Sequence, residues 1–146
     1  MARISETHDG DVGQIRTRLL AVGAALLTVV AGLGLRAGVS GGVAKYGGDA
    51  LYTILIFTIV VLVAPRVTPL TAAGSALAVS CAVEFLQLSQ VPAELSQRSD
   101  LARLVLGTTF NALDLFWYVV GAVVGWLVHT AGGSLSSRRG AGRGRR

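Results

Sequence analysis

Residues 19–35 read LLAVGAALLTVVAGLGL and contain no charged side chain, while Arg18 and Arg36 stand on either side of them. An uncharged apolar run of this length is typical of a helix that crosses a membrane. A secretory signal peptide is the alternative, because a basic stretch precedes the run. No small-x-small cleavage site follows it and the polar stretch before it is long, so we favour a retained helix.

The rest of the chain has the same apolar character. Of its 146 residues, 52% are hydrophobic and 14% are charged, and the mean hydropathy is +0.62. A soluble domain usually has roughly a quarter of its residues charged. Each span needs ~20 residues, so four helices nearly exhaust the chain. We predict an all-α fold, an integral membrane bundle of four transmembrane helices with spans over about 19–35, 47–64, 70–88 and 112–129.

Two connections between these spans have a recognisable composition. The segment Gly38–Gly48 is rich in glycine and predicts a loop, from whose end the second helix starts. Between the third and fourth spans, residues 99–106 place leucine and valine on one side and Arg103 opposite, and Gly107 follows. That pattern predicts a short helix lying in the membrane interface and capped by glycine.

The two ends of the chain are polar. Residues 1–18 and 134–146 lack apolar periodicity, so we expect both to be disordered and residues 19–133 to form the transmembrane domain. The C-terminal tail is expected to contact the lipid bilayer through anionic lipids, and not nucleic acid, because it adjoins a membrane helix. Its five arginines are Arg138, Arg139, Arg143, Arg145 and Arg146.

The distribution of cations predicts the orientation. With both termini in the cytoplasm, nine of the thirteen Lys and Arg residues lie inside, and Arg36, Lys45, Arg98 and Arg103 lie outside. Cytoplasmic segments of membrane proteins carry an excess of Lys and Arg. We therefore expect a multi-pass protein of the inner (plasma) membrane with both termini cytoplasmic.

In this topology, three helix ends bring polar residues to the outer side. A carboxylate inside a span is costly unless it is paired or wetted, so it usually faces a bundle interior or a cavity. Steps of three and four place Glu84 and Gln87 on one stripe with small residues, and Asp114 and Tyr118 on another with Gly121 and Gly125. We predict an outer-leaflet polar pocket formed by Asp49, Glu84, Gln87, Asn111, Asp114 and Tyr118.

Simpler roles remain open for several of these residues. Asn111, Asp114 and Asp49 could act only as helix caps or favour the positive helix end. Glu84 lies too deep in its run for that explanation, and with Asp114 it could hold a hard cation or share a proton. The spacing Gly121-x-x-x-Gly125 lets another helix approach closely, and a partner transmembrane helix is one candidate.

Known catalytic patterns are mostly missing from the sequence. His8 lies in the N-terminal tail and His129 at the opposite end of the fourth helix, so neither can join the carboxylates in a zinc site or a serine–histidine pair. Cys81 is the only cysteine, which excludes an internal disulfide. We assign no catalytic residue and expect no metal or cofactor.

Three ordered motifs resemble a known family. They are Gly48-Asp-Ala-Leu-Tyr52, Glu84-Phe-Leu-Gln87, and the segment from Leu106 to Leu115, LGTTFNALDL. They are similar to a bacterial domain-of-unknown-function family of small four-helix membrane proteins, itself distantly similar to the VanZ-like proteins linked to teicoplanin resistance. The resemblance implies the fold and the polar cluster, but no reaction. It also implies an acidic residue where Asn111 stands, so this chain departs from the family pattern there.

Three functions fit these observations. The favoured one is an envelope protein whose pocket binds a lipid headgroup, an envelope precursor or a drug-like ligand. The second is a structural or assembly subunit of a membrane complex, and the least favoured is a membrane-embedded enzyme that uses Glu84 and Asp114. Negative charge in the pocket disfavours an anionic ligand unless basic residues line its rim.

Overall fold

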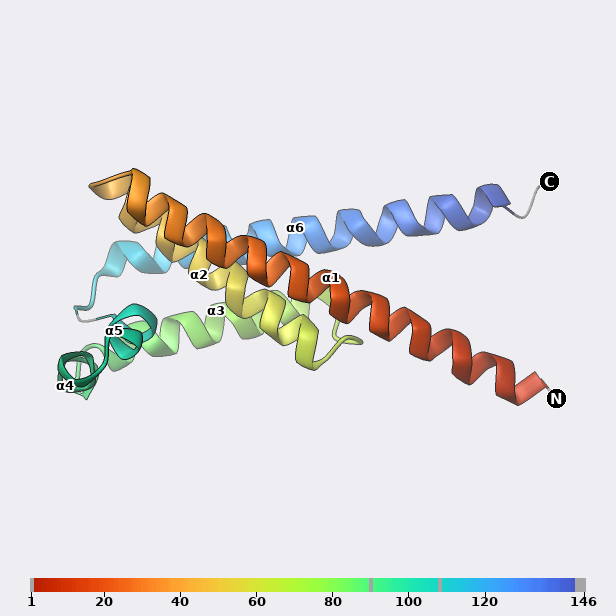
Figure 1. Cartoon of the computed structure of the whole chain (residues 1–146), viewed down its shortest axis with the longest axis horizontal. Coiled ribbons are helices and arrows are strands. Elements are labelled where there is room, and N and C mark those ends of the chain that lie inside the picture. Colours follow the sequence, from red (N-terminus) through yellow and green to blue (C-terminus); the bar gives the residue numbers. More distant parts are fainter. Residues whose placement is uncertain (1, 90, 108, 144–146) are drawn as a thin grey trace.

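The computed structural model describes residues 2–89, 91–107 and 109–143 of the chain. These residues form six α-helices, of which four are long and two are short (Figure 1). The prediction of an all-α fold is confirmed. The helices are α1 (Ala2–Gly38), α2 (Gly42–Val63), α3 (Pro69–Leu86), α4 (Val91–Arg98), α5 (Asp100–Leu106) and α6 (Ala112–Arg143).

The four long helices are long and apolar enough to cross a membrane. The segments that qualify are Val12–Gly38, Gly42–Val63, Pro69–Leu86 and Ala112–Gly133, so the prediction of four helices able to span a membrane is confirmed. Their surfaces carry large apolar side chains, such as Leu27 and Val30 of α1, which are 71% and 66% exposed. Such surfaces suit contact with lipid tails, which are as apolar as leucine itself.

Local sequence explains where the helices begin and end. Gly41 has a φ of 75° and ends the short turn between α1 and α2. Pro69 begins α3, and the Thr68 hydroxyl accepts a hydrogen bond from the Thr71 N–H at 3.2 Å. Gly107, with a φ of 67°, caps α5 as predicted. Both positive φ values favour glycine, which has no Cβ to clash in that conformation.

Three of our predictions about irregular segments differ from the structure. α2 begins at Gly42, so most of the predicted loop is helical; a helix inside a membrane satisfies its own backbone groups, and this outweighs the poor helix propensity of glycine. α1 begins at Ala2 and α6 ends at Arg143, so helix extends into both segments expected to be disordered. Extension of an existing helix needs no new nucleation. Arg145 and Arg146 lie outside the described residues.

The segment that connects the third and fourth spans contains two short helices where we predicted one. The predicted helix is α5, whereas α4 was not predicted. Proline is tolerated in the first turn of a helix, and Pro92 is the second residue of α4. α4 and α5 pack against each other beside the end of α3 (Figure 1).

The other long helices pack around α2. α2 contacts α1, α3 and α6, and α3 contacts α6. Both termini project from the same end, here called the terminal end, and α4 and α5 lie at the other, here called the polar end (Figure 1). The apolar core combines Phe57 and Val61 of α2 with small residues of α1, α3 and α6, namely Ala21, Ala72, Ala73, Ala76 and Ala122.

Candidate polar cavity

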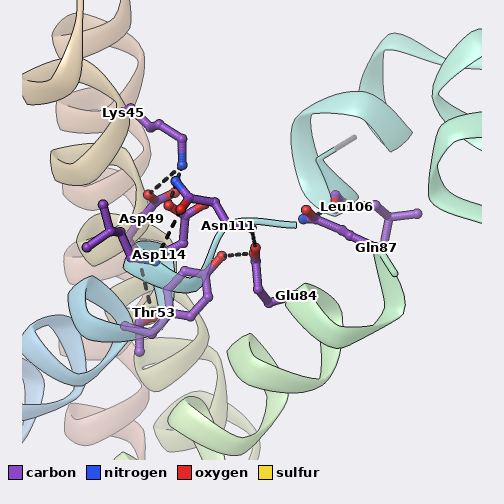
Figure 2. A network of polar contacts seen from close by, with 10 residues as sticks. Lys45, Asp49, Thr53, Glu84, Gln87, Leu106, Asn111 and Asp114 are labelled. Carbon is purple, nitrogen blue, oxygen red and sulfur yellow. Dashed lines mark hydrogen bonds and ion pairs between the residues drawn. The ribbon is translucent and has the colours of Figure 1, made fainter. Parts of the chain in front are cut away.

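An ion-pair cluster joins α2 to α6 at the polar end. The Lys45 ammonium donates a hydrogen bond to Oδ1 of Asp114 and lies 3.7 Å from Oδ2 of Asp49. Figure 2 shows both carboxylates turned toward this ammonium. The side chain of Asp114 is only 7% exposed, so pairing with a cation offsets the cost of its burial. Lys45 and Asp49 are four residues apart on α2, so both side chains lie on the same side of that helix.

Glu84 is fully buried between α3 and α6. The Tyr118 hydroxyl donates to Oε2 at 2.8 Å, and the Asn111 backbone N–H donates to Oε1 at 2.5 Å. Each carboxylate oxygen therefore has a donor, which is the usual condition for burying a charged group. Glu84 and Asp114 have separate partners: Glu84 is bound by Tyr118 and Asn111, and Asp114 by Lys45. A proton or cation shared by the two carboxylates stays a prediction.

A pair of hydroxyls lies one helical turn deeper. Thr53 and Ser80 are fully buried, and their oxygens are 3.0 Å apart. The Thr53 hydroxyl also approaches the backbone oxygen of Asp49, at 3.4 Å. Because Thr53 follows Asp49 by four residues and Ser80 precedes Glu84 by four, the hydroxyls lie below the carboxylates on the same helix faces.

The two amide residues have structural partners. Oδ1 of Asn111 accepts from the N–H of Leu113 at 3.2 Å, so Asn111 caps α6 as well as binding Glu84 through its backbone. The Gln87 side chain lies apart from the Lys45–Asp114 ion pair, beside the end of α5, and donates to the backbone oxygen of Leu106 at 2.7 Å (Figure 2). Gln87 thus ties the end of α3 to the end of α5.

These groups line a cavity of about 760 Å³. Its polar lining includes Lys45, Asp49, Glu84 and Asp114, and two further cations, Arg36 of α1 and Arg103 of α5, also line it. Its remaining walls are largely apolar and come from three helices: Val29 and Leu33 of α1, Leu51 and Leu55 of α2, and Leu104 and Val105 of α5.

All six residues predicted for the pocket belong to this region, and five of them line the cavity itself. Asn111 does not, although its backbone holds Glu84 in place. The contribution of α1 was missed. In the sequence, Arg36 marks only the end of an apolar run, and Gly32 has no side chain. Neither residue therefore indicates in sequence that it lines a polar cavity. Thr53 could have been found, because it stands four residues after Asp49.

Aromatic side chains gather at the same level. Tyr46 stacks on Trp117 with ring centroids 5.7 Å apart, and Phe85 stacks on Phe110 at 6.1 Å. Tyrosine and tryptophan are enriched where membrane meets water. The Tyr46 and Trp117 rings therefore suit a position of the polar end near a membrane interface.

The chemistry available at this site is limited. Within the described residues, no group of three or more His, Cys, Asp or Glu side chains could hold a metal ion. His129 contacts Phe57, with ring centroids 5.8 Å apart, roughly 22 Å along α6 from Asp114 at 1.5 Å per residue. What the cavity offers is a set of paired charges and hydrogen-bonding groups beside apolar walls.

Comparison with known proteins identifies the family. The family model described as "Protein of unknown function (DUF2809)" matches residues 39–122, more than half of the chain. The chain belongs to the DUF2809 family. The DUF2809 region contains the whole polar cluster from Lys45 to Tyr118, whereas Arg36 and the rest of α1 lie outside it. No curated protein and no solved structure matches the chain significantly.

Proposed function

We propose that the polar cavity binds the headgroup of a membrane amphiphile, such as a lipid, a lipid-linked envelope precursor or an amphiphilic drug-like compound. The observation that carries this proposal is the combination of buried charges with apolar walls in one cavity of about 760 Å³. Ligand sites are typically concave, mostly apolar and equipped with a few polar groups that fix orientation. An amphiphile matches both parts of this lining.

The position of the cavity favours a ligand that arrives from the bilayer. α1 packs along α2, and its residues Val29 and Leu33 form one cavity wall while neighbouring positions on the same helix carry exposed apolar side chains. An acyl chain lying against this wall would contact the protein and the surrounding lipid. A ligand without an apolar part would gain nothing from contact with this apolar wall.

We further propose that the polar end faces the outside of the plasma membrane, with both termini in the cytoplasm. The cation distribution supports this orientation, as does the emergence of both termini from one end of the bundle (Figure 1). The cavity then opens in the outer leaflet, and the C-terminal arginines would meet anionic lipids of the inner leaflet. A distant similarity to VanZ-like proteins, with a role in the cell envelope, is part of this proposal.

The two other functions receive less support. For an enzyme, a free carboxylate would be needed as a base, and Glu84 and Asp114 are both engaged by partners within the chain. For an assembly subunit, the Gly121 and Gly125 surface was the main argument. Both glycines face α2 of the same chain: an added Cβ would lie 3.0 Å from the Thr53 Cβ at Gly121 and 3.0 Å from the Phe57 ring at Gly125.

Native mass spectrometry of the gently extracted protein tests the binding proposal. Gly32 lines the cavity and a Cβ added there meets no atom within 4 Å, so Gly32→Leu fills space without a clash. Gly23 lies on the same helix with equally free space but does not line the cavity, so Gly23→Leu is the matched control. We expect wild type and Gly23→Leu to retain an amphiphile and Gly32→Leu to lose it. Equal retention by all three would contradict the proposal.

A further inference from the structure

Two hydrogen-bond acceptors of the cavity are buried without a donor among the described residues. They are Oδ2 of Asp49, on α2, and Oε1 of Gln87, on α3, and no group in the described part of the chain donates to either, although both residues line the cavity. The nearest cation to the Asp49 oxygen is the Lys45 ammonium at 3.7 Å, beyond hydrogen-bonding distance. Buried polar groups are nearly always hydrogen-bonded, so the two oxygens indicate donors that the protein does not itself supply.

The charges around these oxygens indicate the sign of the missing group. Asp49, Asp114 and Glu84 bring three carboxylates into the interior of the cavity, and Lys45 is the one ammonium paired with them. Arg103 lies at the exposed side, 60% accessible, and pairs with Asp100 at 2.9 Å. Arg36 is exposed at the end of α1. The interior therefore has an excess of negative charge, and a second cation would balance it.

We propose that the group entering this cavity is a primary ammonium carried by an amphiphile, with the headgroup of an aminophospholipid as its membrane source. The ammonium donates to Oδ2 of Asp49, and Oε1 of Gln87 accepts from a further N–H or O–H of the same molecule. This inference rests on the proposed binding of an amphiphile and specifies its headgroup. The contact of Lys45 with Asp114 shows that the same cavity already accommodates this chemical group.

Other headgroups fit the two oxygens less well. A choline headgroup is cationic but has no N–H to donate, so it would leave both acceptors unsatisfied. A phosphatidylglycerol headgroup has hydroxyl donors but adds negative charge beside three carboxylates. A primary ammonium supplies both a positive charge and three donors. The phosphate of an aminophospholipid can lie toward the exposed cations Arg36 and Arg103, where the lining is basic.

The test is a lipid titration of the delipidated full-length protein, read by native mass spectrometry. Phosphatidylethanolamine, phosphatidylcholine and phosphatidylglycerol with identical acyl chains are compared, and dodecylamine provides an ammonium without a phosphate. We expect phosphatidylethanolamine to bind at least about tenfold more tightly than the other two phospholipids. Dodecylamine should compete with it, which would assign recognition to the ammonium itself. Binding of dodecylamine without binding of phosphatidylethanolamine would overturn the aminophospholipid as the source of the ammonium.

A pair of isosteric variants tests whether the protein recognises the ammonium or the headgroup as a whole. Asp49→Asn should reduce binding of phosphatidylethanolamine about tenfold, and it should not reduce binding of phosphatidylglycerol, whose repulsion by the carboxylates it relieves. Glu94→Gln makes the same kind of change at an exposed carboxylate outside the cavity, and it should bind as wild type.

The outcomes distinguish this inference from the binding proposal on which it depends. Equal or tighter binding of phosphatidylcholine or phosphatidylglycerol would overturn the ammonium and leave the amphiphile site standing. Binding of none of the lipids and of no dodecylamine would overturn both. Because the comparison of headgroups on the wild-type protein decides the point, it holds even if Asp49→Asn folds poorly.

Discussion

Glu84 shows how a single charged residue can be accommodated within a membrane span. A carboxylate at this depth is costly when unpaired. Here the residue is fully buried, and one donor on each oxygen offsets the loss of water. Both donors come from the start of α6, so the charge of Glu84 also holds α3 against α6 at the polar end. The same residue therefore shapes the cavity and stabilises the bundle.

Removal of one donor should expose this dependence. Tyr118→Phe keeps the ring but leaves Oε2 of Glu84 without its hydrogen bond, so we expect a loss of about 1–3 kcal/mol in the free energy of unfolding. Thermal unfolding in detergent gives the measurement. Tyr46→Phe is the matched control, because the Tyr46 ring stacks on Trp117 and no described contact involves its hydroxyl. Equal stability of the two variants would argue against the buried hydrogen bond.

At the scale of the helices, the contact of α2 with α6 depends on close backbone approach. A Cβ added at Gly121 would clash with the backbone oxygen of Ala50 and lie 3.0 Å from the Thr53 Cβ. Backbone cannot move aside as a flexible side chain can. Small residues at such positions allow helices in membranes to pack through van der Waals contact.

Gly121→Ala should therefore destabilise the protein even though alanine is the better helix former. We expect a cost of about 1–3 kcal/mol from overpacking, measured by thermal unfolding in detergent. Gly132→Ala serves as the comparison on the same helix, since Gly132 is exposed and an added Cβ meets no atom within 4 Å. That change should be neutral or slightly stabilising. A Gly121→Ala protein as stable as Gly132→Ala would mean that α2 and α6 lie further apart.

Much of the helical architecture could be predicted from the sequence because it depends on local patterns. Apolar runs predicted all four spans, and helical spacing placed Glu84, Asp114 and Tyr118 on buried faces. The irregular segments were harder to predict. Glycine and proline were read as loop and stop signals, yet Gly42 begins α2 and Pro92 lies in the first turn of α4. Both residues are tolerated in helices when the surroundings require backbone pairing.

The partners within the polar cluster were harder still. Two contacts between helices illustrate this: Lys45 reaches Asp114, and the backbone of Asn111 reaches Glu84. Both depend on how the helices are rotated and spaced. No pattern within one helix contains that information. The α1 wall of the cavity has the same origin, because an apolar residue facing a cavity is indistinguishable in sequence from one facing lipid.

For the molecule as a whole, packing and polarity are divided between the two ends. Alanines pack in the apolar core toward the terminal end, while charged and hydroxyl side chains surround a cavity toward the polar end. Close packing at one end allows a cavity at the other without loss of the bundle. This division makes the orientation in the membrane decisive for the leaflet from which a ligand would enter.

Reporter fusions measure that orientation. Fusions at the C-terminus and at Ser40, in the turn between α1 and α2, should report opposite sides of the membrane, with the C-terminus cytoplasmic. A cytoplasmic signal from Ser40 and an external signal from the C-terminus would invert the orientation and move the cavity to the inner leaflet. Signals from the same side at both positions would contradict the path of α2, α3 and α6 through the bilayer.

The central claim, a cavity that selects an amphiphile, is tested most directly by photo-crosslinking in intact cells. A photoreactive amino acid is placed at Val29, which lines the cavity, or at Val30, its neighbour on α1, which is 66% exposed and does not line it. Position 29 should capture one headgroup class far above its share of the membrane, and Gly32→Leu should abolish that enrichment. Position 30 should capture lipids in bulk proportion. Bulk proportions at both positions would contradict a selective cavity.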